Sequence, residues 1–499
     1  MLIVNAEIDG RAGRAARIEN GLVVAVSDGP HDTPRPRAAE DVVDARGGML
    51  LPGLHDHHIH LLALAALASS LPAGPPSVRT AAELTAALRA AARPGSWVRA
   101  VGYHESVAGH LDRASLDAIL PDVPVRVQHR SGALWIINSA ALAALRSVGD
   151  DDARAALPAD GRLFRADERL GWLLERAGAG GTVGRADLTA VGARLAGHGV
   201  TGVTDATVTT GPGQVAVLRQ AAEAGALPQR LLLTGPPDLT LGASSNPDSP
   251  TNARANLPPP TNGLPGQGRQ AGPTIGLGPV KIVLDDDQPV DLDALAGIVR
   301  SARARGRRVA VHCVTRAQLA LALAMFDDGG GTRPGDRIEH AAVLPPDLLD
   351  AVAAAGLTIV TQPHFLAERG DAYLAEVDRD DLPWLYRCAG PIAAGVPVAA
   401  GTDAPFGGDD PWASMRAAVH RRAPSGRVLG PGERLDPARA LALYLGDPAS
   451  PGGPPRRVTA GAPADLCLLA QPRRTVLAGL DPGPAALTMI AGKVVHDAL

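Results

Sequence analysis

The sequence predicts an α/β protein: a TIM-type (β/α)8 barrel with a small β-sandwich domain formed by both chain termini. Through the middle of the chain, short apolar segments alternate with Ala-, Leu- and Arg-rich helical segments, which is typical of a parallel sheet covered by helices. Eight such strands can be counted, the number in a closed barrel. Both chain ends instead contain short β-type runs separated by Gly, Pro and Asp turns.

The first of the eight expected strands leads into His58. The other seven are expected at residues 200–205, 230–233, 280–284, 308–312, 337–340, 357–361 and 396–403. Polar residues cluster where these strands end. Since barrels of this type place their active sites at the carboxyl ends of their strands, we expect a functional site there.

We expect residues 52–454 to form the barrel domain and residues 1–51 and 455–499 to form one composite β-sandwich, because neither terminal segment is large enough to be stable alone. Residues 70–190 are expected to form an inserted subdomain. The Pro-, Gly- and Asn-rich segment 236–278 follows the third strand on the expected active face, where a lid and a disordered insertion are equally compatible with its composition.

Composition narrows the class of protein. A formal net charge of −4 gives no basic footprint for nucleic acid or an anionic membrane. The three cysteines, Cys313, Cys388 and Cys467, have no CxxC spacing and are expected to be reduced thiols. No secretory signal and no apolar run long enough to span a bilayer is evident. We therefore expect a cytoplasmic protein with neither nucleic-acid nor membrane partners.

The segment from His55 to His60 holds four of the 14 histidines of the chain. Within it, His58 and His60 share one face if the segment is a strand, because side chains there alternate with a period of two. Two adjacent imidazoles at a strand end are half of a divalent-metal site. The alternative is a solvated turn that is rich in histidine.

Lysine is rare in this chain. Among 48 basic residues, only Lys281 and Lys493 are lysines. A lysine kept inside a hydrophobic strand, as Lys281 is, suggests that an amine is needed there, because a guanidinium cannot lose its proton and react. The alternative is an ordinary lysine that reaches solvent or pairs with Asp285.

Taken in chain order, the expected strand ends carry His58, His60, Lys281, His312, His340 and Asp403. At this point the chain resembles the amidohydrolase superfamily, specifically the amidohydrolase family 3 branch that includes N-substituted formamide deformylases. Five motifs in the family's order span nearly the whole chain. They are Asp-Ala-Arg-Gly-Gly-Met-Leu-Leu-Pro-Gly at 44–53, Asn-Ser-Ala-Ala-Leu at 138–142, Arg-Ile-Glu-His-Ala at 337–341, Gly-Thr-Asp-Ala-Pro at 401–405 and Gly-Ala-Pro-Ala-Asp-Leu at 461–466.

The resemblance implies a metal-dependent hydrolase of amide-type C–N bonds, with N-formyl or cyclic amides as candidate substrates. It implies two divalent ions, with Zn as the first choice and Mn, Fe or Ni also suited to this ligand set. Lys281 would carry a CO2-derived carbamate that bridges the ions. His58, His60 and Asp403 would hold one ion, and His312 and His340 the other. Asp403 would also take the proton of a bridging hydroxide and pass it to the departing nitrogen. Family members are often dimers, so a homodimer is expected.

Several of these residues have simpler interpretations. His312 alone could be a hydrogen-bonded core histidine, and Asp403 could cap a helix. Cys313 is expected in the core. Asp56 could orient a ligand imidazole. His55, His57 and His364 receive no role.

Three further residues are candidates for substrate binding. Asp205 ends a strand, where a structural hydrogen bond is equally compatible. Arg316 follows the fifth strand. His129 could replace an imidazole that the family carries where this chain has Gly132-Ala133, although an exposed loop histidine is equally compatible.

The chain departs from the family pattern around the expected pocket. Residues 313–316 lack the aspartate of the family's Gly-Asp-Arg block, and Asp285-Asp286-Asp287 replaces the family's Asp-Gly and its long substrate-facing segment. The metal chemistry is kept while the pocket is rebuilt, so the resemblance does not imply a deformylase activity.

Two other functions remain to be weighed. A mononuclear deaminase of the same superfamily would need a glutamate shortly after the fifth-strand histidine, and residues 314–316 (Val, Thr, Arg) offer none. A catalytically inactive barrel acting as a scaffold would typically have lost metal ligands, whereas all six are present here.

Overall fold

The structure, a computed structural model, describes residues 1–93, 95–155, 157–164, 166–179, 185–242, 275–284 and 290–499. The chain divides into two compact units, one made of Met1–His60 with Thr189–Leu499 and the other of Leu61–Leu188. Within the described ranges, none of the helices is both long and apolar enough to cross a bilayer. The domain boundaries expected from the sequence stay predictions.

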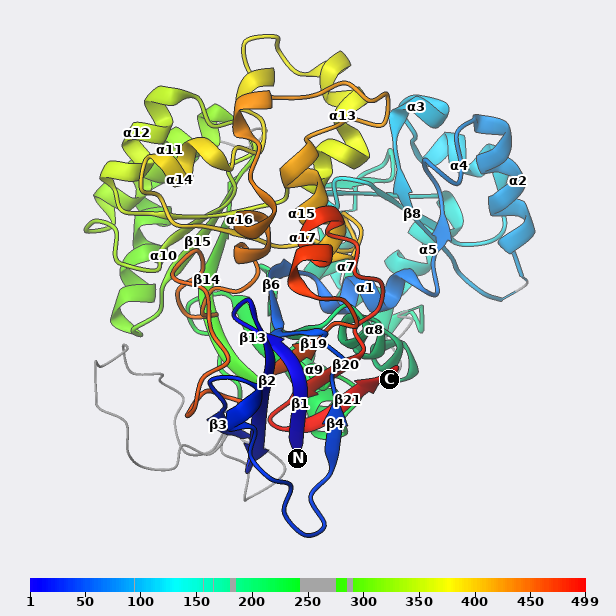
Figure 1. The fold of residues 1–499 in the computed structure, drawn as a ribbon. Coiled ribbons are helices and arrows are strands. Elements are labelled where there is room, and N and C mark those ends of the chain that lie inside the picture. Colours follow the sequence, from blue (N-terminus) through cyan, green and yellow to red (C-terminus); the bar gives the residue numbers. More distant parts are fainter. Residues whose placement is uncertain (94, 156, 165, 180–184, 243–274, 285–289) are drawn as a thin grey trace. The chain divides into compact units, whose positions relative to one another are not determined.

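The first unit contains a parallel sheet of eight strands in the order β18-β17-β16-β15-β14-β13-β12-β6. Figure 1 labels β6, β13, β14 and β15 of this sheet. The strands are β6 (Leu54–Ile59), β12 (Val200–Asp205), β13 (Arg230–Gly235), β14 (Ile275–Val283), β15 (Val309–Cys313), β16 (Arg337–His340), β17 (Thr358–Thr361) and β18 (Val398–Ala400). The prediction of a mixed α/β fold with eight parallel barrel strands is confirmed.

The first and last strands of this sheet approach each other just beyond their ends. The Asp403 amide donates to the His58 carbonyl at 2.6 Å, and the His60 amide donates to the Ala404 carbonyl at 2.8 Å. The sheet is therefore a nearly closed barrel, and the line along which β6 meets the end of β18, here called the seam, runs through residues of the expected site.

Helices follow most of the barrel strands, as the alternating pattern predicts. They are α8 (Arg185–Gly197), α9 (Pro212–Glu223), α10 (Leu292–Ala304), α11 (Arg316–Asp328), α12 (Pro346–Ala354), α13 (His364–Glu376) and α15 (Pro411–His420). Side-chain caps fix where several of them begin, because Asp291 accepts from the Ala294 amide, Thr315 from the Gln318 amide and Asp410 from the Trp412 amide. Shorter elements lie between and after them: η3 (Leu382–Trp384), α14 (Ala389–Ala393), η4 (Pro431–Glu433), α16 (Pro437–Ala442) and α17 (Arg473–Gly479). The expected lid at 236–278 falls mostly outside the described residues.

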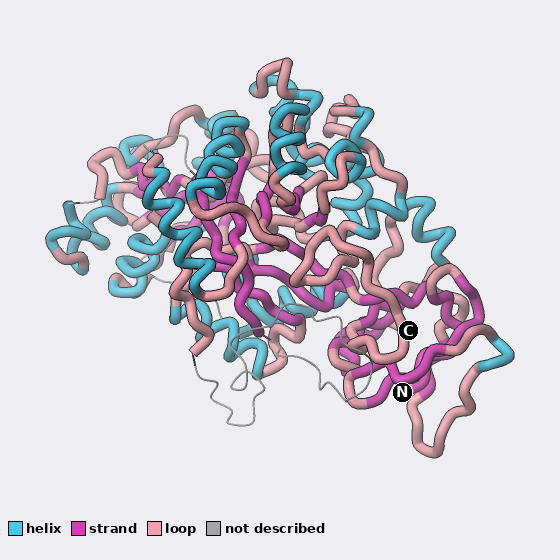
Figure 2. Tube along the Cα trace, turned by 90° about the vertical axis from the view of Figure 1, so that its left-hand side faces the viewer, coloured by secondary structure: helices cyan, strands magenta, loops and turns pink. Residues whose placement is uncertain are grey.

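Both chain ends contribute to a second sheet of the first unit (Figure 2). Its strands are β1 (Leu2–Ile8), β2 (Arg11–Glu19), β3 (Leu22–Val26), β4 (Val42–Asp44), β5 (Met49–Pro52), β19 (Leu466–Leu468), β20 (Leu487–Ile490) and β21 (Lys493–Asp497). The two ends join where β19 pairs antiparallel with β5. These pairings link the strands into one sheet, and the sandwich arrangement stays a prediction. Apolar side chains from both ends, including Ile3, Leu50 and Met489, form one buried cluster.

The second unit is built on a sheet in the order β11-β10-β9-β8-β7. Its strands are β7 (Leu71–Pro72), β8 (Val98–Tyr103), β9 (Val125–His129), β10 (Leu134–Ile137) and β11 (Arg162–Phe164). Its helices are α1 (Leu61–Leu67), α2 (Ala81–Ala91), α3 (Glu105–Ala108), α4 (Arg113–Ile119), α5 (Ser139–Val148), α6 (Asp151–Ala155) and α7 (Asp167–Arg176). Buried clusters such as the one around Leu84, Val98 and Val127 give this unit a core of its own.

Candidate metal centre

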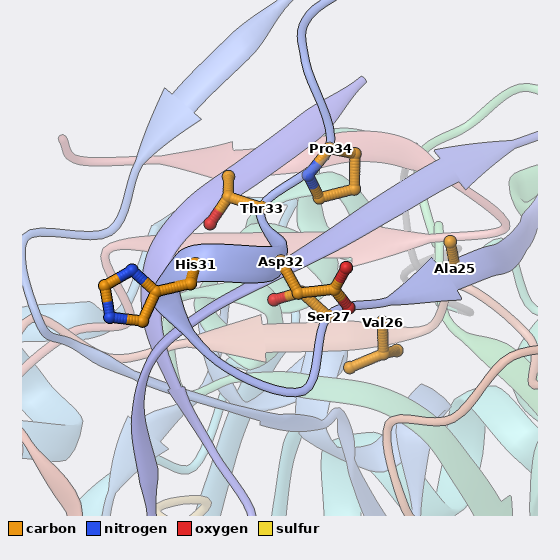
Figure 3. A pocket seen from close by; sticks show the side chains of 7 residues that line it. All are labelled: Ala25, Val26, Ser27, His31, Asp32, Thr33 and Pro34. Carbon is orange, nitrogen blue, oxygen red and sulfur yellow. The ribbon is translucent and has the colours of Figure 1, made fainter.

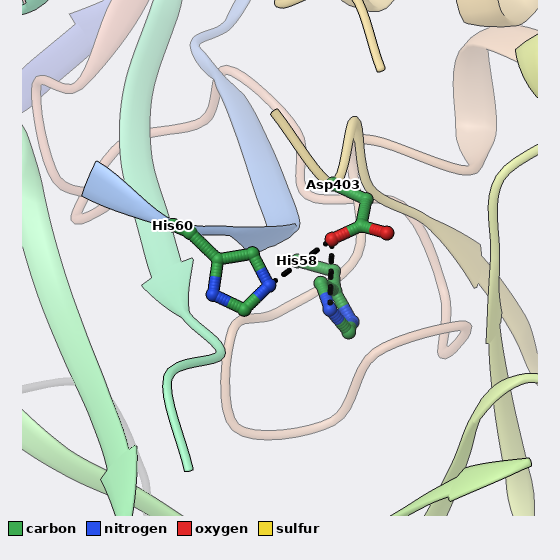
Figure 4. A group of neighbouring side chains, drawn as sticks. All are labelled: His58, His60 and Asp403. Carbon is green, nitrogen blue, oxygen red and sulfur yellow. Dashed lines mark ion pairs between the residues drawn. The ribbon is translucent and has the colours of Figure 1, made fainter. Parts of the chain in front are cut away.

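Two histidines and one aspartate converge at the seam (Figure 4). The Nε2 atoms of His58 and His60 lie 3.4 Å and 3.1 Å from Oδ1 of Asp403. One ligand atom from each of the three residues lies within 4.8 Å of the others, so the group could hold a metal ion. His58 lies in strand β6, and His60 follows two positions later, just after the strand ends. This spacing of two places both rings on one side of the chain.

The backbone at the seam is unusually tight. A Cβ atom added to Gly401 would lie 2.4 Å from the His58 amide nitrogen, so only glycine fits where the end of β18 crosses β6. Asp403 follows with a φ of 52°, a left-handed conformation that is uncommon outside glycine. The close crossing and this turn together bring the Asp403 carboxylate onto the two imidazoles.

Asp56 supports this arrangement through the backbone. Its carboxylate accepts hydrogen bonds from the His58 amide at 3.1 Å and from the Thr402 amide at 3.0 Å and hydroxyl at 2.5 Å. Asp56 therefore ties β6 to the chain beyond β18, and its bonds go to main chain and hydroxyl groups. The prediction that Asp56 orients a ligand imidazole stays a prediction.

The next two histidines lie on neighbouring strands. The ring of His340 lies 4.9 Å from that of His58 and 4.4 Å from that of His312, measured between centroids. His340 directly follows Glu339, and consecutive strand residues normally face opposite sides. Here the φ of His340 is 71°, which breaks the alternation and lets both side chains reach the same cluster.

Glu339 is the residue of the centre that the sequence analysis missed. Its fully buried carboxylate accepts from Nδ1 of His58 at 2.5 Å and from Nε of Arg337 at 2.6 Å. A signal was present, because the charged residues Arg337 and Glu339 alternate in a four-residue strand beside His340. Its partner His58 lies 281 positions away, however, and spacing along the chain could not reveal it.

Hydrogen bonds at Nδ1 set the protonation of the imidazoles. Besides the bond from His58 to Glu339, Nδ1 of His340 lies 2.7 Å from Oε1 of Gln362, and Nδ1 of His60 lies 3.2 Å from the Thr207 hydroxyl. Carboxylate and amide oxygens only accept, so His58 and His340 carry hydrogen on Nδ1 and present the Nε2 lone pair. This is the state in which imidazole binds a metal ion.

Burial and neighbouring charges shift the titration of these groups. Burial, His340 and Lys281 hold the pKa of His312 well below its ordinary value, and burial lowers the pKa of His340 to about 3. Burial and Lys281 also lower the pKa of His58, but the carboxylates of Glu339 and Asp403 outweigh them and raise it. Burial alone would raise the pKa of Asp403, yet the imidazoles around it, His58 first, hold it well below the ordinary value. The centre therefore combines neutral imidazoles at His312 and His340 with an ionised Asp403, while the carboxylates favour the protonated form of His58, which would release its Nε2 proton on binding a metal ion.

Lys281 projects from β14 into the same buried region. Its Nζ atom has no hydrogen-bond partner among the described residues, and the nearest carboxylate oxygen, Oε1 of Glu339, lies 3.9 Å away. Burial lowers the pKa of this amine, against the opposite influence of Glu339. Asp285, the alternative partner considered from the sequence, lies outside the described residues.

The residues expected to bind substrate lie on three different elements. Asp205 ends β12 and accepts from the Thr207 amide at 3.1 Å, and Arg316 begins α11 and pairs with Asp381. His129 ends β9 in the second unit, where Nε2 lies 3.0 Å from Oε2 of Glu105. Their substrate contacts stay predictions.

The residues left without a role are buried. His364 donates from Nε2 to the Thr402 carbonyl at 2.8 Å, and His55 lies 3.0 Å from the Thr204 hydroxyl. Both ring nitrogens of His57 are buried without a hydrogen-bond partner among the described residues. Cys313 is buried, as expected.

A separate pocket of about 420 Å³ lies against β3 and is lined by residues 25–27 and 31–34 (Figure 3). All of its lining comes from one short stretch of chain. His31 and Asp32 are its titratable members, and neither belongs to the cluster around Asp403. We assign no function to it.

Comparisons relate the chain to known proteins. N-substituted formamide deformylase from Arthrobacter pascens is 30% identical over 158 residues, and the match covers 28% of this chain and 28% of that protein. An uncharacterized metal-dependent hydrolase from Pyrococcus horikoshii OT3 superposes with a TM-score of 0.69 at 20% identity over 99% of each chain. Atrazine chlorohydrolase TrzN from Arthrobacter aurescens TC1, complexed with zinc, gives a TM-score of 0.56 at 16% identity over 99% of this chain and 95% of that one. At such identities the structural likeness concerns the fold. The sequence profile of the amidohydrolase family matches residues 41–496, and the chain therefore belongs to the amidohydrolase family.

Proposed function

We propose that this protein is a metal-dependent amidohydrolase that cleaves an amide-type C–N bond of a small molecule at a binuclear centre. The observation that carries the proposal is the cluster of imidazoles at the barrel seam. Two of these rings, His58 and His340, have Nδ1 bound to an acceptor and Nε2 left with a lone pair. A structural cluster of histidines has no need for that orientation, whereas a metal site depends on it.

The donor set fits divalent metal ions. His58, His60 and Asp403 would hold one ion, and His312 and His340 the second. Neutral imidazole with carboxylate suits Zn first, and Mn, Fe or Ni as well. When bound, such ions acidify a water molecule and polarise a carbonyl group.

Lys281 would bridge the two ions after reacting with CO2. The unprotonated amine attacks the carbon of CO2, an N–C bond forms, and one proton is released, which leaves a carbamate with one negative charge. Two features of the site favour this reaction. Burial lowers the pKa of the amine, and Nζ has no hydrogen-bond partner among the described residues.

Asp403 would transfer the proton. Its carboxylate is ionised and lies within 3.4 Å of two Nε2 atoms, so it borders the space where water and substrate would meet. It would accept a proton from the attacking water and deliver it to the departing nitrogen. Without that delivery the amine would have to leave as an anion.

The substrate class follows from the family and the relative named above. That relative is called an N-substituted formamide deformylase, and N-formyl and cyclic amides are the first compounds to screen here. We further propose a cytoplasmic homodimer, whose mass light scattering would measure. The composite sandwich of residues 1–51 and 455–499, the barrel of 52–454 and the insertion at 70–190 complete the proposed organisation.

The test is the variant Lys281→Ala. It should lose amidase activity and bind fewer than two metal ions per chain, and short carboxylates such as formate or acetate should restore part of both. Lys493→Ala is the matched control, because Lys493 is the other lysine of the chain and lies exposed on β21. Full turnover by Lys281→Ala would exclude the bridging role. One bound ion in the wild type together with an unmodified Lys281 would instead support a mononuclear deaminase, and no bound ion would support a scaffold.

A further inference from the structure

Two arginines lie side by side in the second unit, the one formed by Leu61–Leu188. Arg99 on β8 and Arg126 on β9 are direct partners in the parallel register of these strands. Partners in a sheet carry their side chains on the same face, only about 5 Å apart. Two positive charges are thus placed next to each other within one unit.

Both guanidinium groups also contact the same aromatic ring. Arg99 lies 5.8 Å and Arg126 lies 5.6 Å from the centroid of the Trp135 ring on β10. A guanidinium is attracted to the face of an indole ring, which holds the two side chains in place. The ring supplies no ionised group, so it does not balance their charge.

Hydrogen bonds leave the pair largely unsatisfied. The Nε atoms of both arginines are buried without a partner among the described residues. Arg99 donates from Nη1 to the Ala66 carbonyl at 3.0 Å, near the end of α1. Arg126 is only 9% exposed, and no hydrogen bond from its side chain to another described residue is present.

The charges around the two arginines agree with this lack of hydrogen-bond partners. Burial, followed by the charge of Arg99, lowers the pKa of Arg126 to about 10, and burial lowers the pKa of Arg99. No described carboxylate opposes either shift. Buried charges in proteins are normally paired, and here two of the same sign adjoin each other.

Stacking on tryptophan alone does not need such burial. Elsewhere in this unit Arg176 lies 4.9 Å from the centroid of Trp172, and there both residues are exposed and the arginine is single. The pairing of a buried Arg126 with a half-buried Arg99 at Trp135 therefore calls for a different explanation.

We propose that Arg99 and Arg126, held against Trp135, form a binding site for a small oxyanion, a carboxylate or a phosphate. The planar fork of a guanidinium matches the paired oxygens of these groups, and two adjacent forks can bind one anion from two sides. None of its three residues is among the six proposed metal ligands. It adds a ligand-binding role to the inserted unit and does not depend on the proposed hydrolase activity.

The test measures anion binding directly. The full-length protein, stripped of metal by dialysis against a chelator, is titrated with sodium acetate and separately with inorganic phosphate at constant ionic strength in a calorimeter. We expect one anion per chain in the wild type and at least tenfold weaker binding in Arg99→Gln and Arg126→Gln. Arg176→Gln is the matched control and should bind as the wild type does. If only one of the two anions binds, the site is assigned to that class of oxyanion.

A second measurement guards against misfolding of the glutamine variants. Arg126→Lys keeps the positive charge but loses the fork, and it too should weaken binding while its circular dichroism stays unchanged. Anion binding should also change the tryptophan fluorescence, and Trp135→Phe should abolish that change. Equal affinity in Arg126→Gln and wild type, or no binding of either anion to the wild type, would overturn the proposal.

Discussion

The Nδ1 contacts of the histidines are the finest detail on which the metal centre depends. Glu339, Gln362 and Thr207 each meet one ring, and each contact turns Nε2 toward the cluster. Such partners orient a ligand and raise its basicity. The sequence predicted the imidazoles from their HxH spacing and strand-end positions. It did not predict these partners, because each lies on a strand or loop far away along the chain.

Glu339 is therefore expected to be a positioning residue for His58. Glu339→Gln should weaken metal binding about 10- to 100-fold, because a neutral amide holds the imidazole less firmly and has only one oxygen where the carboxylate uses two to accept from His58 and Arg337. The affinity is measured by competition with a chromophoric chelator.

Glu433→Gln is the matched control for this variant. Glu433 is also buried and also accepts from an arginine, Arg387, but it binds the Cys388 and Gly390 amides away from the metal cluster. It should lower stability and leave metal affinity unchanged. Equal metal affinity in Glu339→Gln and the wild type would remove the positioning role.

The buried cysteines predict how the free energy of unfolding depends on pH. Burial raises the pKa of the thiols of Cys388 and Cys467 to about 12. Above about pH 9 these thiols ionise in the unfolded chain and stay protonated in the folded one, so the unfolded state binds fewer protons and stability falls as pH rises. Each thiol should contribute a slope of about 1.4 kcal/mol per pH unit.

Urea unfolding between about pH 8 and pH 10 measures this slope. Cys467→Ala should be less stable than the wild type near neutrality, because it leaves a cavity. Its stability should nevertheless fall less steeply with pH. If the stability of the variant and of the wild type fell equally steeply with pH, the Cys467 thiol would have the same pKa in the folded and the unfolded chain.

Among the secondary-structure elements, β6 and the end of β18 matter most for the site, because the seam between them both closes the barrel and positions His58 and Asp403. The strand pattern predicted both segments and placed His58 and Asp403 at their ends. It did not predict how closely they cross. The chain has many glycines, and the sequence does not show that Gly401 is the one that lies against the His58 backbone. The left-handed backbone of His340 and Asp403 was equally hidden, since Asp and His, although enriched at positive φ, adopt it in only a minority of positions.

Gly401→Ala should therefore damage fold and site together. The added Cβ would meet the His58 backbone at 2.4 Å, and a backbone atom cannot move aside without opening the seam. We expect a loss of at least 1–3 kcal/mol of unfolding free energy, roughly the cost of overpacking a core, and loss of metal binding.

Gly213→Ala is the control for this change, because a Cβ at that helical position in α9 meets no atom within 4 Å and alanine favours a helix. Calorimetric unfolding and metal titration measure both effects. A Gly401→Ala variant that is stable but metal-free would mean that the crossing serves the site alone.

For the whole molecule, the sequence predicted the architecture better than the pocket. Alternation of strands and helices is a long-range regularity that survives local exceptions, so the barrel strands were found with small errors at their ends. The sequence also predicted that the two β-type termini come together, and β19 does pair with β5, whereas the sandwich arrangement stays a prediction. The pocket depends on side chains brought together from distant segments, and the part of the chain from 243 to 274 on the expected active face lies outside the described residues.

The division into two units predicts where metal stabilises the chain. All six proposed ligands belong to the unit made of Met1–His60 and Thr189–Leu499, and none to Leu61–Leu188. Metal at about 100 times its dissociation constant stabilises the folded state by about 2.7 kcal/mol. Hydrogen exchange should slow by up to about 100-fold in peptides from β6, β14, β15, β16 and β18, whose opening exposes the site. Peptides from β8, β9 and β10 should keep their rates, because they open within the other unit. Mass spectrometry of chelated and metal-loaded protein measures both sets of peptides, and equal slowing in both would mean that the two units open together and not separately.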